Sequence, residues 1–138
     1  MIRVQEQAFD VAQELQRFRD ANRLSGATVM FIGTVREMSE GVAIEGMTLE
    51  HYPGMTEKAL AEIEAEAQKR WPLDASLIIH RHGRLLPGDD IVLVITASAH
   101  REAAFESCSF LMDWLKTKAP FWKVEESAPA NRNKCADP

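Results

Sequence analysis

A helical pattern over residues 99–118 is the feature that most limits how this chain folds. Acidic residues lie near the start of this segment and lysines near its end, which is the charge order that a helix dipole favours. Pro120 stops the helix, because proline lacks the amide hydrogen that a helix needs. The apolar residues recur at helical spacing and form one buried face, made of Ala104, Cys108, Leu111, Met112 and Leu115.

Strand patterns surround this helix on both sides in the sequence. Residues 37–41 are predicted to form a turn or mobile loop, and residues 86–89 a turn rich in proline and glycine. Since strand follows strand at several points, an α+β fold fits better than a doubly wound parallel sheet. The predicted strands are 2–6, 26–35, 43–50, 75–84, 90–97 and 121–125, and the other predicted helices are 9–19 and 54–70.

The length and net charge of the chain exclude several classes of protein. With 138 residues the chain is expected to form one domain over 1–127, followed by a tail over 128–138. Lys and Arg number 16 against 21 Asp and Glu, a net charge of −5, which argues against a general nucleic-acid binder. No apolar run reaches the length of a membrane span, and the first residues lack the apolar core of a signal peptide. A cytoplasmic location is therefore expected, with Cys108 and Cys135 as free thiols.

The chemistry suggested by the sequence is cationic. The chain has no P-loop, no G-x-G-x-x-G, no G-x-S-x-G and no paired C-x-x-C. Cations at the ends of elements suit an anionic ligand, and a helix N-terminus adds free amides that bind phosphate. The candidate cations are Arg36, His100, Arg101, Lys116, Lys118 and Lys123.

Each candidate also has a plainer interpretation. Lys116 and Lys118 both complement the helix dipole. Lys116 alone lies at the edge of the apolar stripe, where a half-buried stem would lower its pKa and suit it to proton transfer. Lys118 points elsewhere and is expected in solvent. Lys123 alternates with Trp122 along its strand, so its plain interpretation is a solvent-facing lysine.

Histidines and cysteines carry weaker signals. His80 and His82 form an H-x-H pair on one face of a predicted strand, which favours a surface pair over a metal site because no third ligand is evident. His51 is expected as a hydrogen-bonded loop residue. Cys108 lies on the apolar face as a small hydrophobe, and nothing near Cys135 indicates an activated thiolate.

Long motifs along most of the chain resemble those of the catalytic large subunit of molybdopterin synthase. They are GATVMFIGTVRE (26–37), TLEHYPGMTEKAL (48–60), HRHGRLLPGDDIV (80–92), SAHREAAFE (98–106) and LMDWLKTKAPFWKVEE (111–126). The resemblance implies a single domain of α/β-hammerhead type, with a mixed, largely antiparallel sheet and two main helices. It also implies a homodimer, which becomes a heterotetramer when each large subunit binds a small ubiquitin-like carrier.

The same resemblance implies the reaction. The carrier ends in a Gly-Gly thiocarboxylate, and two sulfurs pass in turn to cyclic pyranopterin monophosphate to give the dithiolene of molybdopterin. The chain would thus be a sulfurtransferase of molybdenum cofactor biosynthesis, with no cofactor, metal, nucleic acid or membrane of its own. Sulfur arrives on the carrier, so no cysteine of this chain is required.

Site residues follow by position in the motifs. The lysines of L-K-T-K-A-P-F-W-K fall on Lys116 and Lys123, which the resemblance makes catalytic. Many relatives continue with a Gly-x-Arg-Trp-Val segment, of which this chain offers only Arg132 as a match. The implied substrate-binding residues are Thr34, Val35, Arg36, His100, Arg101, Val124 and Glu125.

Two other function classes stay open at this point. One is a non-catalytic module that binds the tail of a ubiquitin-like partner, and the other is hydrolysis of a small phosphate ester, for which no nucleophile is evident. Helix geometry bears on the enzyme hypothesis. His100 and Lys116 stand sixteen residues apart, about 24 Å along a helix, so one small substrate meets both only if two subunits share the site.

Overall fold

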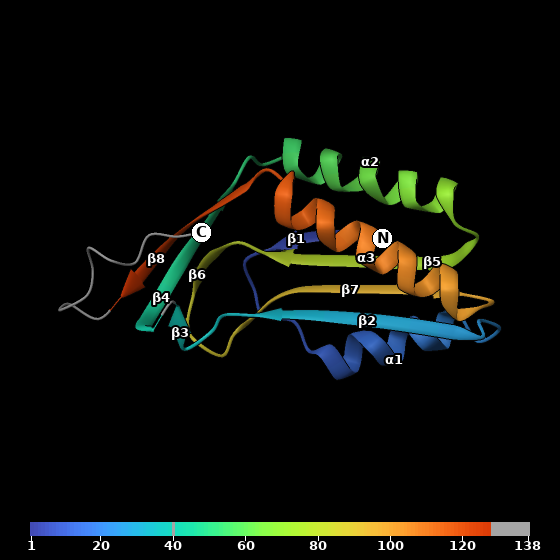
Figure 1. Ribbon diagram of the computed structural model, residues 1–138, viewed down its shortest axis with the longest axis horizontal. Coiled ribbons are helices and arrows are strands. Elements are labelled where there is room, and N and C mark those ends of the chain that lie inside the picture. The colour runs from blue at the N-terminus through green and yellow to red at the C-terminus, as the bar shows by residue number, and fades with distance from the viewer. Residues whose placement is uncertain (40, 128–138) are drawn as a thin grey trace.

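Eleven helices and strands follow one another in the computed structural model, which describes residues 1–39 and 41–127 (Figure 1). In chain order they are β1 (Ile2–Gln5), α1 (Val11–Ala21), β2 (Ala27–Thr34), β3 (Met38–Ser39), β4 (Val42–His51), α2 (Met55–Arg70), β5 (Leu73–Arg81), β6 (Gly83–Leu85), β7 (Asp90–Ser98), α3 (Arg101–Thr117) and β8 (Phe121–Ser127).

The larger sheet has the strand order β1-β5-β7-β2. Only β1 and β5 run parallel, and the pairs β5–β7 and β7–β2 are antiparallel. Figure 1 shows α2 and α3 over one face of this sheet and α1 against the other. The expected α+β domain with a mixed, largely antiparallel sheet and two main helices is confirmed.

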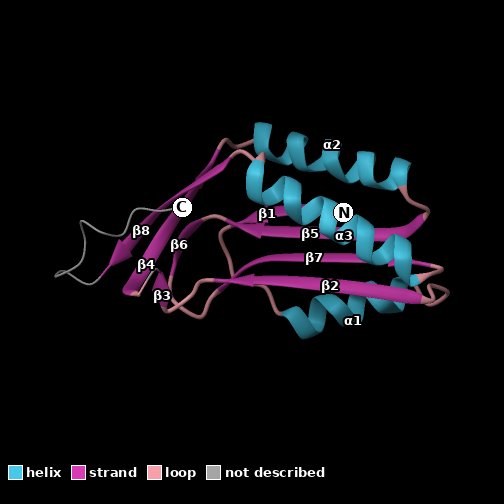
Figure 2. Ribbon diagram, viewed as in Figure 1, coloured by secondary structure: helices cyan, strands magenta, loops and turns pink. Residues whose placement is uncertain are grey.

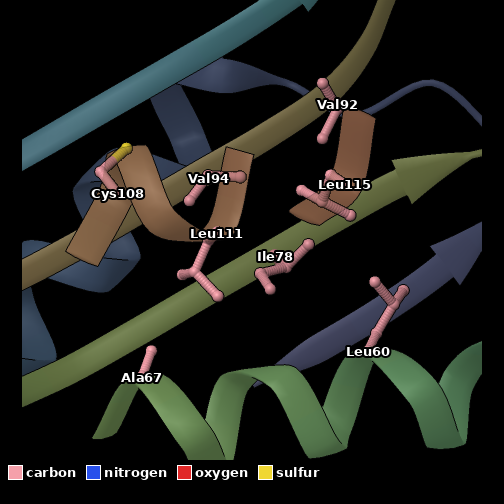
Figure 3. Close-up of a cluster of buried hydrophobic side chains, with 8 residues drawn as sticks. All are labelled: Leu60, Ala67, Ile78, Val92, Val94, Cys108, Leu111 and Leu115. Carbon is pink, nitrogen blue, oxygen red and sulfur yellow. The ribbon is translucent and has the colours of Figure 1, made fainter. Parts of the chain in front are cut away.

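Two apolar cores lie on opposite faces of the larger sheet. Ile78 and Val94 point toward α2 and α3, while their neighbours Leu77 and Ile95 point toward α1. Strands buried on both faces explain why β5 and β7 read as continuous apolar runs. Figure 3 shows the cluster beneath α2 and α3, made of Leu60, Ala67, Ile78, Val92, Val94, Cys108, Leu111 and Leu115.

A smaller sheet is built on β4, which pairs antiparallel with β3, β6 and β8. Figure 2 shows this sheet beyond one end of the larger sheet, next to the ends of β2 and β5. A third apolar cluster, of Val35, Met47, Leu49 and Leu85, lies beneath it. The two sheets therefore meet over apolar side chains.

The prediction of one strand over 75–84 is wrong, because this segment forms two strands that belong to two different sheets. β5 ends at Arg81 and pairs with β1 and β7, whereas β6 pairs with β4. Gly83 begins β6 with φ of +89°, a left-handed conformation that suits glycine. This break lets one apolar run pass from the larger sheet to the smaller.

Three further boundaries differ from expectation. The predicted turn over 37–41 contains β3, whose two residues pair with β4. α1 begins at Val11 rather than residue 9, because the side chain of Asp10 caps it by accepting from the amide of Gln13 at 3.0 Å. β8 extends to Ser127, two residues beyond the prediction.

The helices are otherwise where the sequence predicts them. α2 begins one residue after Gly54, whose amide donates to Glu57 Oε1 at 2.8 Å. α3 begins at Arg101 with His100 as its N-cap residue, and Lys118 is its C-cap. Across the described ranges 1–39 and 41–127, no helix is both long and apolar enough to cross a membrane.

Candidate active site

Phe121 lies where the two sheets meet. It packs against the cluster beneath α2 and α3 and also against the cluster beneath the smaller sheet. Its ring stacks on that of His80, with centroids 3.8 Å apart and planes 14° apart. The segment before it is tied to α2, since the Thr56 hydroxyl donates to the Pro120 carbonyl at 3.3 Å. We refer to this contact region around Phe121 and His80 as the joint.

Three predicted site cations are attached to buried residues near the joint. Arg36 follows Val35, which belongs to the smaller core, and Lys116 follows Leu115, which belongs to the larger one. Lys123 pairs in register with Leu49 on β4. Figure 1 shows the end of β2, the end of α3 and the start of β8 at the same side of the molecule. The fold thus places the three segments that carry these cations toward one side of the molecule.

His100 and Arg101 lie elsewhere, at the N-terminal end of α3. Together with Gly26, Ala27, Ala99 and Glu102 they line a shallow pocket beside the start of β2. Residues 101–117 are one unbroken helix, so this pocket is about 24 Å from the C-terminal end of α3. Within one chain the structure therefore separates two of the predicted ligand-binding residues from the other cations.

Backbone bonds hold the segment that carries Arg36. The amide of Val35 donates to the Asp89 carbonyl at 2.9 Å, and the Val35 carbonyl accepts from Gly88 at 2.8 Å. The Thr34 hydroxyl donates to Asp90 Oδ1 at 3.1 Å. The side chain of Val35 is buried and its backbone is hydrogen-bonded, so the backbone of Arg36, the next residue, is held in a fixed place.

The remaining predicted substrate-binding residues lie on β8. Val124 pairs with Thr48 of β4, and Glu125 pairs with Met47. Both therefore continue the strand that carries Lys123. Arg132 and Cys135, together with the predicted tail over 128–138, lie outside the described residues.

The expected half-burial of Lys116 is wrong for the single chain. Lys116 and Lys118 are both exposed, because Leu115 takes the inward position at this turn of α3. A difference in burial within one chain therefore does not distinguish the two lysines. What distinguishes them is position, since Lys116 lies within α3 and Lys118 is the residue that caps it.

The expected surface pair of histidines is also wrong. His80 is 8% exposed, and burial lowers its pKa to about 4. His82 lies outside the strands, and its ring centroid is 4.2 Å from that of His51 at the end of β4. Among the residues that the structure describes, no group of three His, Cys, Asp or Glu side chains is arranged to hold a metal ion.

Cys108 is the small buried hydrophobe that its position predicts. Its thiol is free, and burial raises the pKa of that thiol to about 11. A thiol with so high a pKa is mostly protonated at neutral pH and is a poor nucleophile. Cys108 is therefore unsuited to carry sulfur.

One surface was not anticipated from the sequence. β2 is an edge strand, paired with β7 on one side and with no other described strand on its second side. Its central residues Met30, Phe31 and Ile32 are 37%, 40% and 38% exposed. The signal in the sequence was an apolar run typical of a central strand. Apolar side chains along an unpaired edge are typical of an interface with another chain.

Comparison with known proteins identifies the family. The sequence model of the MoaE protein family matches residues 4–118, which include both ends of α3 and all of the larger sheet except the first two residues of β1. The chain belongs to the MoaE family. Lys123, Val124 and Glu125 lie just beyond the matched range.

Individual MoaE relatives cover nearly all of the chain. The molybdopterin synthase catalytic subunit of Pseudomonas aeruginosa is 55% identical over 139 aligned residues, which cover 99% of this chain and 93% of that protein. The solved MoaE protein of Burkholderia ambifaria matches with a TM-score of 0.83 and 52% identity, covering 94% of this chain and 84% of that one. The solved molybdopterin synthase of Staphylococcus aureus matches with a TM-score of 0.82 and 32% identity, covering 92% and 91%.

Proposed function

We propose that this MoaE-family chain transfers sulfur from the thiocarboxylate of a small ubiquitin-like carrier to cyclic pyranopterin monophosphate, forming the dithiolene of molybdopterin. The observation that carries the proposal is that Arg36, Lys116 and Lys123 each follow or pair with a buried residue of the two clusters against which Phe121 packs. The chain is also 55% identical to a molybdopterin synthase catalytic subunit. Each transfer exchanges sulfur on the carrier for oxygen on the pterin side chain. The carrier ends as a carboxylate, and no outside electron donor is needed.

The residues divide by chemistry. Lys116 and Lys123 move protons to and from the pterin side chain and the departing oxygen, as a positioned amine does in general acid–base catalysis. His100 and Arg101 hold the phosphate, for which charged donors and helix-terminal amides are suited. Arg36 binds the substrate beside the two lysines, at the reacting end. The rest of the substrate contacts the backbone of four further residues, Thr34, Val35, Val124 and Glu125. Cys108 takes no part, because the sulfur arrives on the carrier.

A second copy of the chain completes the site. The helix α3 keeps His100 and Lys116 about 24 Å apart, and a cyclic pterin phosphate is roughly half as long. His100 and Arg101 of one subunit therefore join Arg36, Lys116 and Lys123 of the other. A two-fold dimer contains two such sites.

The exposed edge of β2 is the surface that suits this dimer. If two β2 strands pair antiparallel about a two-fold axis near Phe31, the start of each strand lies beside the end of the other. Gly26, next to β2's start, lines the pocket that contains His100, and Arg36 follows β2's end. Pairing along this edge therefore brings the two halves of the site together and covers the exposed apolar side chains.

The carrier is the remaining partner. Its Gly-Gly tail is required because only a chain without side chains threads a narrow channel to the lysines. One carrier on each subunit of the dimer gives a heterotetramer. We place the protein in the cytoplasm, where a free thiol such as Cys108 stays reduced.

The decisive experiment mixes the chain with a thiocarboxylated carrier and cyclic pyranopterin monophosphate, and follows dithiolene product by mass spectrometry. We expect product with the intact carrier and none with a carrier that lacks its last two glycines. If the shortened carrier transferred sulfur at the normal rate, the proposed narrow channel for its tail would be wrong. A stable complex that forms no product would instead support a module that only binds the carrier.

A further inference from the structure

His80 occupies an unusual place for a polar side chain. It lies near the end of β5, paired with Val92 of β7 and two residues after Ile78. Residues two apart share a face of a strand, so His80 points to the same side as Ile78, toward α2 and α3. At 8% exposure it closes the larger core at the joint.

Two contacts fix the His80 ring. Its Nδ1 lies 2.9 Å from the carbonyl oxygen of Arg81, and since a carbonyl only accepts, Nδ1 carries the hydrogen and donates. The second contact is with the ring of Phe121, whose centroid lies 3.8 Å from that of His80 and whose plane is nearly parallel to it. The hydrogen bond sets the plane of the imidazole, and that plane is the surface on which Phe121 rests.

Phe121 in turn is connected to a proposed catalytic lysine. It is the first residue of β8, and Lys123 follows two residues later on the same face of the strand. In register with β4, Phe121 pairs with His51 and Lys123 pairs with Leu49. A shift of the Phe121 ring would therefore carry the start of β8 with it.

We propose that His80 is a positioning residue for sulfur transfer, whose ring holds Phe121 and thereby sets the place of Lys123 relative to the substrate. The inference rests on the proposed function for its catalytic consequence. Its structural part, the hold of His80 on β8, stands independently. His80 itself touches no reacting atom.

Two substitutions of His80 separate the role of its ring from the role of its hydrogen bond, and a third substitution, at His82, is a control. His80→Asn keeps a donor near the Arg81 carbonyl but removes the ring, and His80→Phe keeps an aromatic ring without the donor. His82→Val is the matched control, because the ring of His82 contacts His51, whose ring centroid lies 6.2 Å from that of Phe121 against 3.8 Å for His80. All are assayed as the complex with the thiocarboxylated carrier, after circular dichroism confirms the fold.

We expect His80→Asn to lower kcat by about fivefold, the scale of one lost aromatic pair, with KM for the pterin within about twofold. His80→Phe should recover most of kcat, and His82→Val should match the wild type. A merely structural role would lower the melting temperature of His80→Asn without this split between kcat and KM. Loss of kcat in His80→Phe equal to that in His80→Asn would overturn the proposal.

Hydrogen exchange tests the inference without any activity. In His80→Asn, amides of residues 121–123 should exchange about fivefold faster, while those of β7 stay protected. If His80→Asn does not fold, Phe121→Leu, which keeps apolar bulk but loses the ring face, is expected to give the same pattern. Unchanged exchange at the start of β8 would refute the hold of His80 on Lys123. If the wild type forms no dithiolene yet exchange behaves as expected, the proposed function fails and the positioning stands.

Discussion

His100 and Lys116 lie at opposite ends of α3, sixteen residues and about 24 Å apart along one unbroken helix. No rotation of side chains removes that distance within a subunit. A site that uses both residues must therefore be assembled from two chains, and this arrangement can be tested by mixing inactive variants.

Complementation is the first prediction. Arg101→Ala and Lys116→Ala should each be inactive as homodimers, and mixing them should restore activity, because each heterodimer has one site with both residues intact. About a quarter of wild-type activity is expected from random mixing, since half the dimers carry one intact site. Dithiolene formation is measured alongside native mass spectrometry that counts heterodimers. Heterodimers without activity would show that each site lies within one subunit.

The two lysines at the end of α3 should differ sharply. Lys116→Ala is expected to reduce sulfur transfer by at least about a hundredfold, the scale of a lost proton-transfer group. Lys118→Ala should change it by less than about twofold, because that residue only caps the helix. Both variants are compared by product formation at matched circular dichroism. Equal losses would remove Lys116 from the mechanism.

The β2 edge makes a prediction about assembly. Phe31→Lys places two like charges near the proposed two-fold axis and should convert the dimer to a monomer that keeps its fold. Analytical ultracentrifugation measures the change, and activity should fall with the dimer fraction. Leu24→Lys is the control, since Leu24 is 99% exposed but lies outside β2. A Phe31→Lys protein that stays dimeric would place the interface on another surface.

The lack of a side chain at Gly26 is predicted to preserve the shape of the pocket at the start of α3. A Cβ at this position would lie 2.2 Å from the carbonyl oxygen of Ala99, a backbone atom that cannot move aside without displacing His100. Gly26→Ala should therefore raise KM for the pterin and destabilise the fold by about 2 kcal/mol. Gly33→Ala, whose Cβ would meet side-chain atoms alone, a methyl group of Val92 at 2.7 Å and the ring of Phe31 at 3.4 Å, should leave KM unchanged. Steady-state kinetics and urea unfolding distinguish the two.

Acid should weaken the fold through His80. The pKa of His80 is about 4 in the folded chain against an ordinary value of 6.5, so the unfolded state binds the proton more readily. The contribution is complete above about pH 6.5 and is lost as pH falls toward 4, with a total of about 3 kcal/mol. Between pH 7.5 and 4, the free energy of unfolding of the wild type, measured by urea unfolding, should fall by this amount relative to that of His80→Phe. Parallel curves would mean that His80 is not buried neutral.

Local patterns in the sequence were enough to predict the helices and most of the strands. The 3.6-residue spacing identifies α3 and its buried face, and Pro120 predicts where the helix ends. Motif matches named the candidate site residues, because a motif is a run of neighbouring residues that the sequence alone displays. Periodicity depends on neighbours along the chain, so a sequence is sufficient to determine it.

Pairings between distant segments could only be learned from the tertiary structure. The stack of His80 on Phe121 joins residues that are far apart in the sequence, and the break between β5 and β6 depends on which sheet each strand meets. The free edge of β2, which pairs with no second strand among the described residues, depends likewise on how distant strands pair. The sequence by itself determined most of the elements, the buried face of α3 and the candidate cations of this protein. The tertiary structure decided which of these meet, because contacts across the fold depend on packing that no local pattern encodes.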